Sequence, residues 1–76
     1  MDTLNLRFTL HEDCPIAEYM LDGIITEYFP QEDDTYQVIF KGIDETLIEC
    51  MQTDELAEWL GIEPEFVIAA EVLEFA

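Results

Sequence analysis

The sequence predicts a small α+β domain, in which an antiparallel sheet of three or four strands packs against two or three helices. Residues 3–10 alternate between apolar and polar side chains, as a strand with one buried face does. Residues 16–28 instead repeat apolar side chains at helical spacing. Seventy-six residues, half of them apolar, can bury one compact core, so we expect a single compact acidic domain over residues 1–76.

The first two elements expected are a strand and a helix. The apolar face of the strand, from Thr3 to Leu10, consists of Leu4, Leu6, Phe8 and Leu10. Asp13 can cap the following helix, and Pro15 suits its first turn. The helix should end before Pro30, because the residue before a proline disfavours helical backbone angles.

A hairpin and a second helix are expected next. Residues 35–41 are rich in β-branched and aromatic side chains. Residues 42–44 would form a turn, and residues 46–51 would form the second strand of the hairpin. Thr53 can cap a helix that Gly61 ends in a left-handed conformation. Its core-facing side chains would be Leu56, Trp59 and Leu60.

The last segment, residues 64–75, has two interpretations. Pro64 suits a first helical turn, and apolar residues follow at helical spacing, which favours a helix. Residues 66–68 and 72–75 are also typical of strands. A final strand would complete a strand-helix-strand-strand-helix-strand order like that of the ferredoxin-like fold. The overall order is therefore β-α-β-β-α, followed by a helix or a strand.

The net charge is the strongest functional signal. Nineteen Asp and Glu residues against Arg7 and Lys41 give a formal net charge of −17. Such a surface repels nucleic acids and anionic membranes and attracts basic proteins. Seventeen charges correspond to roughly 29 Å of duplex DNA, and a compact chain of this length should be about 30 Å across. We expect a basic nucleic-acid-binding protein or complex as partner, with no direct nucleic-acid or membrane contact.

Candidate catalytic and metal-binding groups are few. The chain has no Ser and no glycine-rich phosphate loop. His11 and Cys14 lie close in sequence, but acidic surroundings raise the pKa of a thiol, which disfavours a nucleophile. His11, Cys14 and Cys50 lack the spacing of a compact zinc site, and residues 32–34 lack the pattern of a calcium loop. We predict no enzyme activity, no cofactor and no metal site. The two cysteines are expected to be free thiols, the alternative being one disulfide.

Residues 56–67 resemble the packing positions of helix-turn-helix DNA-binding motifs. These positions are Leu56, Ala57, Leu60, Gly61, Ile62 and Val67. A second helix entering a DNA groove would, however, carry Glu65, Glu71 and Glu74 against the phosphates. The resemblance therefore implies a packing role or a protein contact, and not DNA reading.

The carboxylates are expected to form one or two acidic faces, on which they would lie in rows as phosphates do along a duplex. The candidate partner-binding residues are Glu18, Asp22, Glu32, Asp33, Asp34, Glu45, Glu49, Asp54, Glu55 and Glu58. A plainer alternative is that they only keep the protein soluble. Salt adaptation also produces acidic chains, but such chains reduce bulky apolar residues, and this one has eight Ile and nine aromatic residues.

In length, charge and compactness the chain resembles the small acidic DNA-mimic inhibitors that phages make against host nucleic-acid enzymes. This class includes anti-CRISPR proteins, anti-restriction proteins and uracil-glycosylase inhibitors. The resemblance implies competition, in which carboxylates engage the Lys and Arg side chains of a DNA groove while neighbouring apolar side chains anchor the complex. The candidate anchors, each of which could instead belong to the core, are Tyr19, Tyr28, Phe29 and Tyr36.

The alternative function is that of an antitoxin, immunity protein or adaptor, which would hold a basic protein without nucleic-acid mimicry. Binding of a mimic excludes DNA or RNA, whereas binding of an adaptor need not. The sequence has no basic segment followed by an apolar one at its start, and no apolar run of membrane-spanning length. We expect a cytoplasmic protein, acting in the host cytoplasm if a phage encodes it, as a monomer or small homo-oligomer.

Overall fold

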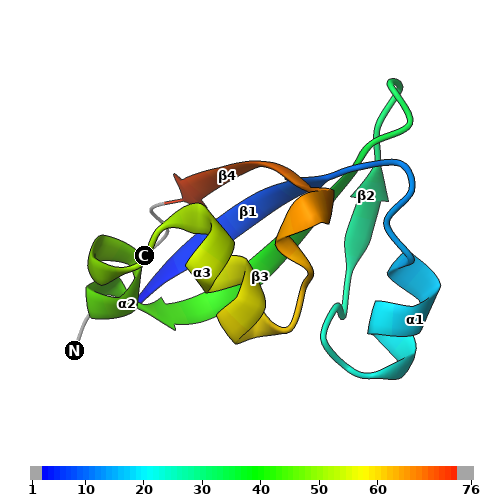
Figure 1. Ribbon diagram of the computed structural model, residues 1–76. Coiled ribbons are helices and arrows are strands. Elements are labelled where there is room, and N and C mark those ends of the chain that lie inside the picture. Colours follow the sequence, from blue (N-terminus) through cyan, green and yellow to red (C-terminus); the bar gives the residue numbers. More distant parts are fainter. Residues whose placement is uncertain (1–2, 74–76) are drawn as a thin grey trace.

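The computed structural model describes residues 3–73 and has the α+β architecture expected from the sequence (Figure 1). Four strands form one antiparallel sheet, connected by three short helices and a 3-10 turn. In chain order the elements are β1 (Thr3–Leu10), α1 (Ile16–Leu21), β2 (Tyr28–Pro30), β3 (Tyr36–Asp44), α2 (Glu45–Cys50), α3 (Thr53–Leu60), the 3-10 turn η1 (Pro64–Phe66) and β4 (Val67–Leu73).

The sheet has the strand order β2-β3-β1-β4, and all neighbouring strands are antiparallel. β1 and β2 are therefore parallel to each other with β3 between them, and β3 and β4 are parallel with β1 between them. The chain thus forms two interleaved β-α-β units. This is the order that a final strand was expected to complete, with α2 as an additional helix.

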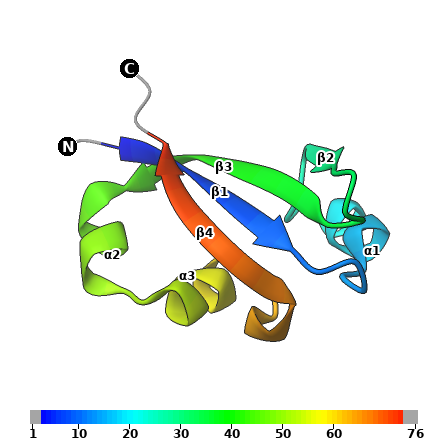
Figure 2. The same ribbon diagram turned by 90° about the horizontal axis from the view of Figure 1, so that it is seen from above.

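One face of the sheet carries the hydrophobic core. α3 crosses the sheet on this side, and Figure 2 shows α2 and α3 on the same side of the sheet. The alternation predicted for β1 is confirmed, because Leu6, Phe8 and Leu10 are at most 1% exposed. They belong to one cluster with Val38 of β3 and Leu56 of α3. The opposite face of the sheet carries the polar side of β1.

The first helix is shorter than predicted. The sequence suggested a helix up to the residue before Pro30, whereas α1 ends at Leu21 and Gly23 follows with a left-handed φ of 77°. The chain then turns, so that Ile25 enters the core with 2% of its surface exposed. Tyr28 begins the edge strand β2, which pairs with β3. Tertiary pairing therefore replaces the second half of the predicted helix.

The predicted hairpin is wrong in its second strand. β3 continues through the expected turn at 42–44, and residues 45–50 form α2. Asp44 caps this helix, because its side-chain oxygen accepts a hydrogen bond from the Thr46 backbone N–H at 2.9 Å. The hairpin that the structure does contain joins β2 to β3 through residues 31–35. Glu45 and Glu49 consequently lie on a helix and not on a strand.

The second predicted helix is confirmed as α3, and Gly61 ends it with a left-handed φ of 98°. Leu56 is buried and Leu60 is partly buried, as expected. Trp59, which was expected in the core, is instead 54% exposed, and the small side chain of Ala57 is fully buried. The close packing of Ala57 brings α3 near the sheet and leaves Trp59 at the surface.

Two predicted helix caps are also wrong. The N-cap residue of α1 is Pro15 and not Asp13, and that of α3 is Gln52 and not Thr53. Neither helix has a side-chain cap hydrogen bond. Thr53 is instead the first residue of α3 itself.

The last segment is a strand and not the helix that the sequence favoured. Pro64 begins only the short turn η1, and residues 67–73 pair with β1 as β4. Pairing with β1 satisfies backbone groups that would otherwise lie at a free sheet edge, and this tertiary gain outweighs local helical spacing. No helix-turn-helix forms, so Glu65 and Glu71 do not lie on a second helix. Glu74 lies outside the described residues.

Candidate functional site

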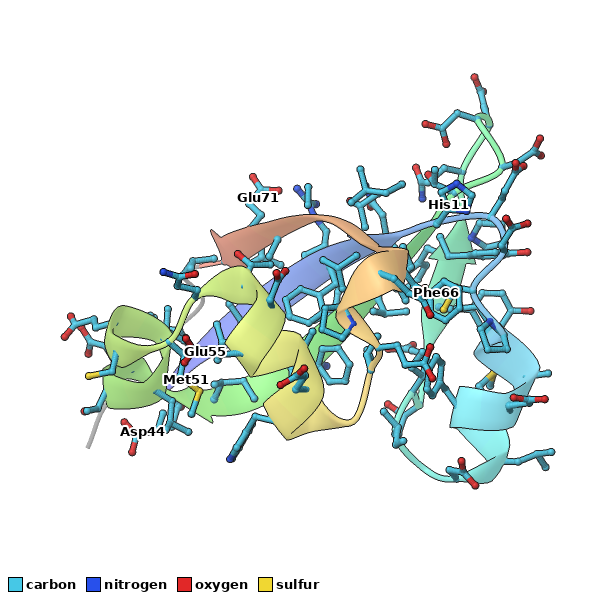
Figure 3. All side chains as sticks on the ribbon, in the orientation of Figure 1. His11, Asp44, Met51, Glu55, Phe66 and Glu71 are labelled. Atoms are coloured by element: carbon cyan, nitrogen blue, oxygen red, sulfur yellow. The ribbon has the colours of Figure 1, made fainter. Side chains whose placement is uncertain are left out.

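The site expected from the sequence is a surface of carboxylates, and the structure exposes nearly all of the candidates. Nine of the ten candidate residues are exposed, and Glu45 is partly buried. Within residues 3–73 the ion pair is that of Arg7 with Glu71, while His11 Nδ1 accepts a hydrogen bond from the Asp13 backbone N–H at 3.1 Å. The negative charge therefore has almost no internal compensation and faces solvent, as the side chains in Figure 3 illustrate.

A first acidic cluster surrounds the loop between β2 and β3. We call it the loop patch, and it consists of Glu12, Asp13, Glu32, Asp33 and Asp34. The antiparallel pairing of β1 with β3 ends at Leu10 and Tyr36, which places residues 11–13 beside residues 31–35. Glu12, Asp13 and Asp34 line an open pocket of about 330 Å³. Glu32 and Asp33 line a second pocket on the side of Thr9. Five carboxylates from two distant segments thus meet at one end of the sheet.

Local hydrogen bonds hold the loop in a defined conformation. One carboxylate oxygen of Asp33 accepts from the Thr35 hydroxyl at 2.5 Å and from the Thr35 backbone N–H at 3.2 Å. These bonds, the hydroxyl bond foremost, lower the pKa of Asp33 because they stabilise its charged form. Asp34 adopts a left-handed φ of 69°, which Asp tolerates better than most residues. The Gln31 side-chain amide donates to the Phe29 carbonyl at 3.0 Å. The loop therefore presents its carboxylates from a fixed backbone.

A second acidic cluster lies on α2 and α3. We call it the helical patch, and it consists of Glu45, Glu49, Asp54, Glu55 and Glu58. Glu45 and Glu49 are four residues apart, so they share one face of α2. On α3 the three carboxylates lie on the side away from the buried residues. Asp54 and Glu55 are in the first turn, where negative charge is favourable.

Glu18 and Asp22 form a third, smaller group at α1. Glu18 lies in the first turn of the helix, and Asp22 follows its last residue. Both side chains are exposed. Asp22 places a negative charge at a helix C-terminus, where the helix dipole disfavours it. The position of Asp22 is therefore not explained by the stability of α1.

The structure does not gather the ten candidate residues on a single face. α2 lies at one end of the molecule, and α1 lies at the other end with β2 (Figure 1). The loop of residues 31–35 projects from that second end on the side away from α1 (Figure 1). The longest dimension is 34 Å, against 22 and 21 Å for the other two. The carboxylates thus form three groups, of which the loop patch and the group at α1 share one end of the molecule, while α2 lies at the other end.

Two of the four candidate aromatic anchors are exposed beside the loop patch. Tyr28 and Phe29 on β2 are 39% and 43% exposed. Tyr28 packs edge-to-face on Tyr36 with ring centroids 5.8 Å apart, and Tyr36 lines the pocket of the loop patch. Tyr19 is buried instead, and its hydroxyl accepts a hydrogen bond from the Glu63 backbone N–H at 3.2 Å. Burial raises the pKa of Tyr19. Tyr19 therefore belongs to the core and ties α1 to the segment after α3.

His11, Cys14 and Cys50 do not converge. Cys14 is buried before α1, whereas Cys50 is exposed on α2 at the opposite end of the molecule, and both are free thiols. Burial, and to a lesser degree the charge of Glu63, raises the pKa of the Cys14 thiol to about 11, in the direction expected. In the part of the chain that the structure describes, no three His, Cys, Asp or Glu side chains lie close enough to hold a metal ion.

Sequence reasoning missed Glu12 and Asp13 as members of the loop patch. The signal that could have identified them is strand register, because a strand ending at Leu10 must turn beside the start of its antiparallel partner. Glu63 and Glu65 were also missed. The pKa of Glu63 is raised by three causes, of which a side-chain hydrogen bond with Glu65 is the largest and desolvation and repulsion by the charge of Glu65 are smaller. Glu63 and Glu58 line a pocket after α3, so the helical patch extends toward η1.

Comparison with known proteins gives no relative, since no protein family, curated protein or solved structure matches this chain. None of the helices within residues 3–73 has the length and apolar character needed to cross a membrane. Inferences about function therefore depend on the geometry and charge of the surface.

Proposed function

We propose that this protein binds the basic nucleic-acid-binding surface of a host or phage-defence protein in the cytoplasm and blocks it, with carboxylates in the place of phosphates. The observation that supports this most is the loop patch. Its five carboxylates have no Lys or Arg partner within residues 3–73. They come from a hydrogen-bonded loop and the adjoining end of β1.

The geometry of the loop patch favours binding over mere solubility. Because the loop is held by its own hydrogen bonds, little conformational entropy is lost when a partner binds. The uncompensated charge would speed association with a basic groove. The exposed rings of Tyr28 and Phe29 lie beside the carboxylates and supply the apolar contact that charge alone lacks. These features together support the proposal of an inhibitor that would replace nucleic acid on its protein.

The test is affinity capture of host-lysate proteins on the immobilised chain at low salt, repeated with excess duplex DNA and followed by mass spectrometry. We expect a nucleic-acid-binding protein to be captured and then displaced by the duplex. A captured partner that remains bound at every DNA concentration would contradict the proposal. A column carrying unfolded chain of the same sequence controls for capture by negative charge alone.

The separation of the carboxylates into three groups supports one alternative, an antitoxin, immunity protein or adaptor that contacts a basic protein through a single group. Such a contact would not need to cover a groove that is long enough for a duplex. The loop patch and the helical patch lie toward opposite ends of the molecule, so a small partner would contact only one of them. Retention of the partner in the presence of duplex DNA would favour this alternative.

A further inference from the structure

The two edges of the sheet are protected very differently. β2, at one edge, has three residues and ends in Pro30, which lacks a backbone N–H. β4, at the other edge, has seven residues, Val67–Leu73, without a proline or a lysine. Within residues 3–73 the only strand that pairs with β4 is β1, and β4 is the outermost strand of the sheet (Figure 2). One side of its backbone is therefore free to pair with another strand.

The exposed side chains of β4 are apolar apart from that of Glu71. Residues 68–72 are all exposed, and Ile68 and Val72 are 54% and 43% exposed. Ala70 and Val72 project to the same face of the sheet, because they pair with Phe8 and Leu6 of β1 in regular register. Exposed, long and apolar edge strands normally pair with another chain unless a charge, a proline or a bulge prevents it. β4 has one bulge, at its start, where Val67 pairs with Leu10 and Ala69 with Thr9 and Ile68 is the extra residue, whereas residues 69–73 pair with β1 in regular register.

The charge on β4 argues against a basic protein as the occupant of this edge. Glu71 is the only charged residue of the strand, and it pairs with Arg7 of the neighbouring strand within the same chain. The edge is therefore nearly neutral on a protein of net charge −17. The one carboxylate that β4 offers a basic partner is already paired with Arg7, so we expect the occupant to match the edge through apolar side chains and backbone hydrogen bonds.

We propose that a second copy of this chain pairs with the free edge of β4, antiparallel and related by a two-fold axis through Ala70. In this register Ile68 lies opposite Val72 of the second copy, and Val67 lies opposite Leu73. Ala69 lies opposite Glu71, whose charge Arg7 already compensates. The large exposed side chains of Ile68 and Val72 thus gain apolar neighbours across the strands, and no two charges oppose each other. The result is one continuous sheet of eight strands.

Repulsion between the two copies sets the expected salt dependence. Each carries a net charge of −17, so bringing them together costs electrostatic free energy that salt screens. Pairing through one strand buries less area than the roughly 1,200 to 2,000 Å² of a standard interface. We therefore expect a weak dimer that becomes tighter as salt increases. Binding of a basic partner would show the opposite salt dependence, so the two proposals can fail separately.

The first test is sedimentation equilibrium of the full chain between about 0.05 and 0.5 M NaCl. The average mass should rise from monomer toward dimer with protein concentration, more strongly at high salt. Ile68→Lys should weaken the dimer at least tenfold, because it places a charge opposite Val72. Leu21→Lys makes the same charge change at a residue that is 87% exposed on α1, and it should leave the dimer intact. A monomer under all conditions, or equal effects of both substitutions, would overturn the proposal.

The second test does not depend on the strength of the dimer. Antiparallel neighbours have Cα atoms about 4.5 to 5.5 Å apart, within the range of about 4.4 to 6.8 Å that a disulfide spans. Ala70→Cys, combined with Cys50→Ser, should therefore form a disulfide-linked dimer with oxidised glutathione at high salt. Ala17→Cys on the exposed side of α1 is the control. Cross-linking of Ala70→Cys no faster than that of Ala17→Cys would show that the strands do not pair in this register.

Discussion

The loop patch and the β4 edge are both exposed, but they leave different groups unpaired. The loop patch has five carboxylates, none of which pairs with a Lys or Arg side chain in the described part of the chain. β4 has one carboxylate, already paired with Arg7, beside a row of apolar side chains and a free backbone edge. We propose that charge draws a basic protein to the first region and that apolar matching draws a second copy to the other. The comparison teaches that a strongly acidic protein can have a part of its surface that is nearly neutral.

The largest expected effect concerns the position of the acidic interface. One variant neutralises the loop patch with five substitutions, Glu12→Gln, Asp13→Asn, Glu32→Gln, Asp33→Asn and Asp34→Asn. Asn at position 33 can still accept from Thr35, and Asn at position 34 tolerates a positive φ. We expect association with the captured partner to slow by about tenfold or more, because electrostatic steering is lost. Stopped-flow measurements at low salt check this.

The matched control neutralises the five residues of the helical patch and so makes the same change in net charge. Its substitutions are Glu45→Gln, Glu49→Gln, Asp54→Asn, Glu55→Gln and Glu58→Gln. We expect a smaller reduction in the association rate, which reports only the loss of overall charge. A larger reduction in this variant than in the loop-patch variant would move the interface to α2 and α3.

A smaller effect is expected from the aromatic residue next to the loop patch. Phe29→Ala should increase the dissociation rate of the partner, corresponding to a loss of about 1 to 2 kcal/mol of binding free energy. Trp59→Ala is the control, because Trp59 on α3 is similarly exposed, at 54% against 43% for Phe29. Surface plasmon resonance measures both dissociation rates. If Trp59→Ala accelerates dissociation more than Phe29→Ala does, the contact lies on the side of α3.

The smallest expected effect is the pH dependence of stability. The pKa of Glu63 lies above its ordinary value of 4.5 in the folded protein. Its contribution to the free energy of unfolding is therefore fully present below pH 4.5 and is lost as pH rises through the higher folded-state pKa. The pKa of Asp33 lies below its ordinary value of 3.8, so its contribution is present above that pH and is lost as pH falls through the lower pKa. Protonation of other carboxylates also reduces charge repulsion, so it too raises the free energy of unfolding as pH falls.

The free energy of unfolding should therefore rise as pH is lowered from neutral toward 4.5 and should fall below 3.8. Urea denaturation followed by circular dichroism measures this profile. Glu63→Gln should flatten the rise, and Asp33→Asn should reduce the fall at low pH. A steady loss of stability from neutral pH downward would mean that specific carboxylate hydrogen bonds outweigh the repulsion.

The parts of the fold that sequence could predict are those set by local pattern. β1 alternates cleanly, and the left-handed Gly61 ends α3 as expected. The errors occur where pairing or a single side chain overrides propensity. Residues 46–50 are typical of a strand, but the cap supplied by Asp44 begins a helix. Residues 67–73 had helical spacing, but the edge of β1 was available for pairing. The secondary-structure propensity of a short segment reports neither the side-chain cap of Asp44 nor the free edge of β1.

The candidate site was predictable in composition but not in arrangement. Carboxylates are rarely buried, so the sequence alone indicated that Glu32, Asp33 and Asp34 would face solvent. Which carboxylates lie together depends on strand register, which brings Glu12 and Asp13 to the loop. The neutral β4 edge could not be predicted, because it requires both the strand assignment and the ion pair of Glu71.

The most direct test of nucleic-acid mimicry is a competition titration with the purified partner that affinity capture identifies. A fluorescent DNA duplex is titrated with that partner at several fixed concentrations of this chain. If carboxylates occupy the phosphate sites, the apparent dissociation constant of the duplex should rise in proportion to the concentration of the chain, without a plateau. A plateau, or an unchanged constant, would mean that chain and DNA bind together and would contradict the mimicry.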